Sequence, residues 1–180
     1  MASYRSDDLH RRHPLRRLVA EWMRVPAVGR LSVDPLPDVA VRRLIAALGP
    51  DLAESAVGRI VARAEGNAFF VEELVAAGPG DDEVPDDLAD LLLIRLDRLS
   101  GQAHHVVRVA SAAGRKVSHE LLAATVDSDA AALDEGIRQA IEMHVLEAGN
   151  DQYSFRHALL GEAVYDVLLP GERVRLHARF

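Results

Sequence analysis

The chain has 180 residues, of which 49% are hydrophobic and only 4% aromatic, a length and composition that fit one large or two small globular domains able to bury a core. The absence of cysteine excludes disulfides and thiolate metal sites. No apolar run reaches the roughly 18 residues of a membrane helix, and no apolar signal segment is visible. We therefore expect a cytoplasmic protein without a membrane contact.

The net charge of −7 is unevenly distributed along the chain. Residues 1–30 hold seven arginines against three acidic residues, a net of +4, so the rest of the chain carries −11. An acidic body repels phosphate, and it makes nucleic acid a poor general partner.

The N-terminal part predicts one helix and a short strand. Residues 1–14 have no clear period, and Pro26 ends the helix that follows them. An apolar stripe at helical spacing is formed by Leu15, Leu18, Val19, Trp22 and Met23. Leu31 and Val33 alternate with polar neighbours before Pro35, which favours a short strand.

Residues 36–80 predict a helical subdomain of three helices. Apolar residues recur at helical spacing through residues 37–77, and the helices are separated by Gly49-Pro50 and by Gly66. Asn67 is a suitable N-cap for the third helix. Residues 78–87 combine glycine, proline and clustered acid, so we place a linker at residues 81–87.

Residues 88–180 predict a winged-helix domain and the start of a following helix. A very apolar helix over residues 88–99 comes first, and Ser100, Ser118 and Asp129 are expected to cap the next three. The period then changes to two short strands around Gly149-Asn150-Asp151, a hairpin pattern, before a last helix over 156–169. The fold class expected is mainly α: a helical lid bundle followed by a winged-helix module with one small β-hairpin.

No catalytic motif is visible in the sequence. There is no Gly-x-x-x-x-Gly-Lys-Ser/Thr phosphate loop and no nucleophile elbow, so we expect no enzyme and no catalytic residue. His104 and His105 point about 100° apart on a helix and cannot share a metal well, from the helical period. His10 and His13 lie in an arginine-rich arm, and we expect no metal site there.

Three stretches carry a resemblance to a known family. They are residues 4–16 (YRSDDLHRRHPLR), 65–74 (EGNAFFVEEL) and 153–165 (YSFRHALLGEAVY), the last followed by 168–173 (LLPGER). Together they resemble the large ATP-binding LuxR-type transcriptional regulators, which belong to the STAND class of AAA-related signalling ATPases. The resemblance spans essentially the whole chain in the family's order.

The resemblance implies that the chain is a piece of a larger regulator. Residues 1–35 would be the remnant of a P-loop ATPase core, 36–80 the lid, and 88–180 the winged helix with the start of the next helix. The implied function is regulatory and non-catalytic: the fragment transmits the nucleotide state to the rest of the protein. The parent would bind ATP or ADP with magnesium, and its own ATPase core would be the fragment's partner.

Four residues match nucleotide-sensing positions of that family. Arg5 would sense the terminal phosphate, and Asn67 and Ala68 would lie near the adenine, where Ala68 replaces the family's usual proline. His157 would contact the diphosphate. Three of these residues also have a purely structural interpretation. Arg5 would be a solvated arginine, Asn67 an ordinary helix cap, and His157 a half-buried histidine at a helix start.

Two rival functions stay open on the sequence alone. A stand-alone DNA-binding winged helix would read DNA with residues 129–143, but that stretch holds four acidic residues against one arginine. A protein-interaction module could use the stripe of residues 15–23, and a homodimer through Leu15, Leu18, Val19, Trp22 and Met23 is expected. We expect no direct nucleic-acid contact.

Overall fold

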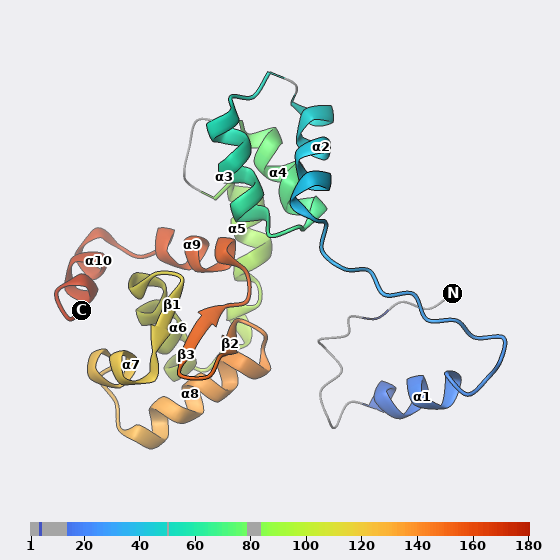
Figure 1. Cartoon of the computed structure of the whole chain (residues 1–180). Helices are drawn as coiled ribbons and strands as arrows, with labels where there is room; N and C mark the ends of the chain where they lie inside the picture. Colours follow the sequence, from blue (N-terminus) through green and yellow to red (C-terminus); the bar gives the residue numbers. More distant parts are fainter. Residues whose placement is uncertain (1–3, 5–13, 50, 79–83) are drawn as a thin grey trace. The chain divides into compact units, whose positions relative to one another are not determined.

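The protein is described by a computed structural model that covers Tyr4 and residues 14–49, 51–78 and 84–180. The chain divides into two compact units, Met1–Asp34 and Pro35–Phe180 (Figure 1). The first unit contains the predicted N-terminal helix. The second contains the predicted lid and winged-helix regions.

The first unit has one helix, α1 (Pro14–Trp22), as the apolar stripe predicts. No residue of α1 is buried, and Leu18, Trp22 and Met23 keep exposed fractions of 41%, 43% and 46%. The prediction of a strand around Leu31 and Val33 was wrong. These residues have no regular secondary structure, and 88% and 89% of their surfaces are exposed. A strand needs a neighbour for its backbone groups, and no described strand pairs with this segment.

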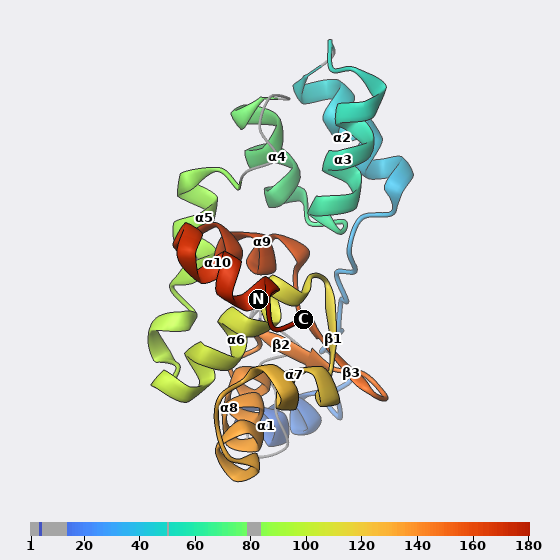
Figure 2. The ribbon, with the colours of Figure 1, turned by 90° about the vertical axis from the view of Figure 1, so that its left-hand side faces the viewer.

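The lid consists of the three predicted helices, α2 (Asp38–Leu48), α3 (Glu54–Ala64) and α4 (Ala68–Ala77). The three pack against one another, as Figure 2 shows. Their apolar stripes meet in a core formed by Val41, Ile45, Ile60, Ala64, Val71 and Leu74. Burying such side chains contributes about 1.5–3 kcal/mol each, which stabilises helices too short to persist alone.

The long apolar helix expected over residues 88–99 is interrupted. It is formed as α5 (Asp86–Leu93), and a turn then leads into the 3₁₀ segment η2 (Leu96–Arg98). Leu88 and Leu92 are buried, whereas Leu91 and Ile94 remain 53% and 56% exposed. Residues 81–83 of the predicted linker lie outside the described residues. Val84 is buried in the core, and Asp86 and Asp87 already belong to α5, so the linker is shorter than expected.

The winged-helix module has the order helix, strand, two helices and a hairpin. Its elements are α6 (Gly101–Ala113), β1 (Lys116–Ser118), α7 (His119–Thr125), α8 (Ala130–Glu142), β2 (Leu146–Ala148) and β3 (Gln152–Phe155). The predicted caps are confirmed: the side chains of Ser100, Ser118 and Asp129 accept from the backbone N–H groups of Ala103, Leu121 and Ala132. Each satisfies a donor left over at a helix start.

The strands form an antiparallel sheet in the order β1-β3-β2. The β2–β3 hairpin confirms the prediction, and it pairs Leu146 with Phe155. Strand β1, which pairs Val117 with Tyr153, was not predicted. The expected helix over 156–169 is formed as α9 (Ala158–Asp166), and the helix expected to follow it is formed as α10 (Pro170–His177). Pro170 suits the first position of that new helix.

One hydrophobic core runs through the second unit, from Val41 in the lid to Val164 in α9. Helix α6 lies at its centre and packs against both α8 and α9 (Figure 2). Val106, Val107 and Val109 of α6 are fully buried. Among the described helices, none has both the length and the apolar character needed to cross a membrane.

Candidate functional site

The turn between α3 and α4 holds two of the predicted site residues. Glu65 and Gly66 adopt left-handed backbone conformations, with φ of +49° and +76°, and this reverses the chain between the two helices. Asn67 then caps α4, since its Oδ1 accepts a 3.1 Å hydrogen bond from the Phe69 N–H. Ala68 is the exposed first residue of α4.

Glycine is required at the second position of this turn because the chain approaches closely there. The carbonyl of Gly66 accepts a 2.8 Å hydrogen bond from the Leu36 N–H. A Cβ on Gly66 would lie 2.6 Å from the Leu36 carbonyl oxygen, well inside van der Waals contact. The turn is thereby fixed against the segment that leads into α2.

His157 immediately precedes α9 and faces this turn. Its ring meets the Phe70 ring edge-on, with centroids 5.4 Å apart and an interplanar angle of 88°. Its Nδ1 lies 3.7 Å from the Glu65 carboxylate, and its side chain is 21% exposed. A protonated imidazole would attract that carboxylate, and a neutral one would do so only weakly.

Two ion pairs hold the same turn to the winged-helix module. Arg115, at the start of the chain into β1, donates to Glu65 at 2.9 Å. Arg63, in the last turn of α3, lies 2.7 Å from Glu162 in α9, and its side chain is only 16% exposed. Glu65 therefore contacts both Arg115 and His157, and it links the lid to two separate elements of the winged helix.

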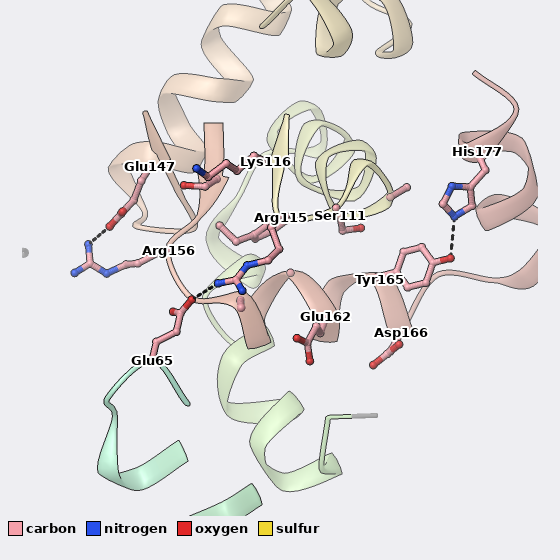
Figure 3. A pocket seen from close by; sticks show the side chains of 16 residues that line it. Glu65, Ser111, Arg115, Lys116, Glu147, Arg156, Glu162, Tyr165, Asp166 and His177 are labelled. Atoms are coloured by element: carbon pink, nitrogen blue, oxygen red, sulfur yellow. Dashed lines mark hydrogen bonds and ion pairs between the residues drawn. The ribbon is translucent and has the colours of Figure 1, made fainter. Parts of the chain in front are cut away.

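A cleft of about 550 Å³ opens beside this junction (Figure 3). Charged residues of both signs line it, among them Glu65, Arg115, Lys116, Arg156 and Glu162. In Figure 3 the Glu65–Arg115 pair lies between the Arg156–Glu147 pair and the hydrogen-bonded Tyr165–His177 pair. A mixed-charge lining of this kind offers hydrogen bonds to a polar ligand.

The structure brings three of the four predicted site residues into one region. Asn67 and Ala68 lie at the start of α4, between Glu65 and Phe70, and these two residues contact His157. None of the three lines the cleft, which they border through Glu65 and Ala158. Arg5 lies outside the described residues. Among those that are described, no group of three or more histidine or acidic side chains could hold a metal ion.

Sequence reasoning missed the residues that connect this region. Glu65 and Arg115 are 50 positions apart, and Arg63 and Glu162 are 99 positions apart. The only local signal is that Glu65 directly precedes the Gly66-Asn67 pair. Pairings over such separations follow from tertiary packing, which a single sequence does not reveal.

The face that would read DNA is acidic. On α8, the side opposite the core exposes Asp134, Glu135 and Glu142 together with one cation, Arg138, and Arg138 is paired with Glu135. The hairpin adds Glu147 and no unpaired arginine, since Arg156 donates to Glu147 at 3.1 Å. Neutralising DNA phosphates requires the opposite sign.

Comparison of the chain with family models, with curated proteins and with solved structures gives no match. The site is therefore interpreted from its own residues.

Proposed function

We propose that the chain is the regulatory lid and winged-helix part of an ATP-dependent regulator of the LuxR type, acting in the cytoplasm. In this proposal it is not an enzyme: it responds to the nucleotide held by an ATPase core and passes that state on. ATP or ADP with magnesium would be bound by the intact parent, and the core would be the partner of this chain. Rigid-body movement of the winged helix against the lid is the expected response.

One observation supports this proposal most. Glu65, in the lid beside Asn67 and Ala68, contacts His157 of the winged-helix part: its carboxylate lies 3.7 Å from the His157 Nδ1. Glu65 and Phe70, which contact His157, lie two positions before Asn67 and two positions after Ala68, although Ala68 and His157 are 89 positions apart. A ligand that touched all three would add or remove contacts between the two parts.

The proposal is tested by titrating the isotope-labelled full chain with ADP and following its amide signals by NMR. Because the sequence has no phosphate loop, we expect ADP to bind weakly, with a dissociation constant of about 1 mM. This corresponds to a binding free energy of about −4 kcal/mol. The shifted signals should cluster at residues 65–70 and 157–160. His157→Ala should abolish these shifts, and His104→Ala, a matched change in α6, should leave them unchanged. Shifts scattered over the chain, or a micromolar dissociation constant without His157, would contradict the proposal.

The stand-alone DNA-binding alternative makes a different prediction. With the exposed side of α8 acidic, we expect no specific complex in a gel shift at physiological salt. A sequence-selective, salt-sensitive shift would favour that alternative. Within the described part of the chain, no observation supports it.

A further inference from the structure

Helix α1 presents an apolar surface that its own unit does not bury. None of its residues is buried, and Leu18, Trp22 and Met23 each keep more than two fifths of their surface exposed. Nine residues are fewer than the roughly 12–15 that an isolated helix needs to persist in water. A stripe of this kind requires a covering surface to remain ordered.

The charges around the stripe are positive. Residues 14–30 contain four arginines and a single acidic residue, Glu21. Arg17 donates to Glu21 at 3.0 Å, so the positive charge of Arg16 and Arg24 dominates the edge of the stripe. The covering surface should be apolar at its centre and acidic at its rim.

The exposed side of α5 has this character. Leu91 and Ile94 are separated by one helical turn and are 53% and 56% exposed, and residues three apart lie on the same side of a helix. Asp87, Asp90 and Asp97 are exposed around them. Arg98 is exposed as well and Arg95 is partly buried, so residues 86–98 carry four aspartates against two arginines, a net charge of −2 beside the two large apolar side chains.

Other exposed surfaces fit less well. On α8 the exposed acids Asp134 and Glu142 have no large exposed apolar side chain beside them. Near α10, Leu169 and Val174 are 67% and 69% exposed, but Arg173 and Arg175 flank Val174. On α4, Phe69 is 42% exposed near Glu72, but it is a single large side chain, whereas Leu91 and Ile94 present two together.

We propose that α1 of one chain binds the exposed face of α5 of a second copy. Leu18, Trp22 and Met23 would cover Leu91 and Ile94, with arginines facing aspartates. A two-fold dimer would form this contact twice, because each copy supplies one helix and one acceptor surface. Residues 28–37 have no regular secondary structure, and ten extended residues span up to about 33–36 Å, which allows α1 to reach a partner.

The test uses charge reversal in the full chain. One variant carries Arg16→Glu and Arg24→Glu, and the other carries Asp87→Arg and Asp90→Arg. In either variant alone, like charges face each other in both contacts. The dissociation constant of the dimer should therefore rise at least about tenfold. In an equal mixture of the two variants, opposite charges face each other again in both contacts. Sedimentation velocity across a concentration series measures the outcome.

The expected result is a dimeric wild-type chain, two monomeric variants and a dimeric mixture. The emission maximum of Trp22 should shift to longer wavelength in each variant and return to the wild-type value in the mixture. The matched control, Asp134→Arg with Glu142→Arg on α8, should stay dimeric. The proposal is overturned if the wild-type chain is monomeric, if the mixture stays monomeric, or if the α8 control dissociates. Rescue only when all four changes are in one chain would mean that α1 covers its own α5.

Discussion

Gly66→Ala should destabilise the protein by disturbing the turn that carries Asn67. An L-residue at a φ of +76° costs about 1–2 kcal/mol. The added Cβ would also lie 2.6 Å from the carbonyl oxygen and 2.9 Å from the nitrogen of Leu36. The segment must move, and the loss of the Leu36 N–H···O=C Gly66 hydrogen bond costs about 1 kcal/mol more. We expect a total loss of about 2–3 kcal/mol in the free energy of unfolding, the sum of these two effects.

Urea unfolding followed by circular dichroism measures this loss, and two further variants separate its causes. Gly66→Asn relieves part of the backbone strain, because asparagine tolerates left-handed backbone, but it keeps the clash and should still cost about 1 kcal/mol. Gly58→Ala in α3, where a Cβ meets nothing within 4 Å, should stabilise by about 0.5–1 kcal/mol. A Gly66→Asn variant as stable as wild type would refute the close-approach argument.

Two further predictions concern charged groups. Arg63→Met, which breaks the partly buried pair with Glu162, should lower the free energy of unfolding by about 1.5–3 kcal/mol. Arg138→Met, at an exposed intrahelical pair, should change it by at most about 0.5 kcal/mol. Equal losses of the two variants in urea unfolding would contradict this. The N–H of Leu169, together with a neighbouring arginine, holds the pKa of Glu172 below its usual range. Its contribution to stability is therefore present above the pKa of the unfolded chain and is lost as pH falls through the lower folded pKa. Glu172→Gln should lose stability relative to wild type at neutral pH, and the difference should shrink in acid; a difference independent of pH would show that the carboxylate is not stabilised.

The local part of the fold could be predicted from the sequence. Asn67, Ser118 and Asp129 were recognised as helix caps because a cap depends on residues only two or three positions away. The β2–β3 hairpin was recognised for the same reason, since Gly149-Asn150-Asp151 is a turn between two short runs.

Features that depend on distant residues could not be predicted. Strand β1 is too short to show a period, and it is a strand only because β3 lies beside it. Leu31 and Val33 alternate like a strand but have no neighbour to pair with among the described residues. The nearly continuous apolar residues of 88–99 do not indicate that α5 ends at Leu93.

The candidate site divides in the same way. Asn67 and His157 were identified by their motifs, and their proximity was not visible in either motif. The Glu65–Arg115 ion pair, which connects the turn to the winged helix, required the folded structure. Side chains that act between two parts of a fold show no local sequence period, so they are the hardest to find in a single sequence.

The central claim is that this chain is the lid and winged helix of a larger nucleotide-dependent regulator. The most direct measurement is the genomic coding sequence upstream of Tyr4. The account predicts, in the same reading frame, a Gly-x-x-x-x-Gly-Lys-Ser/Thr phosphate loop followed by an apolar strand that ends in acidic residues able to bind magnesium. An upstream region that encodes neither would contradict the account.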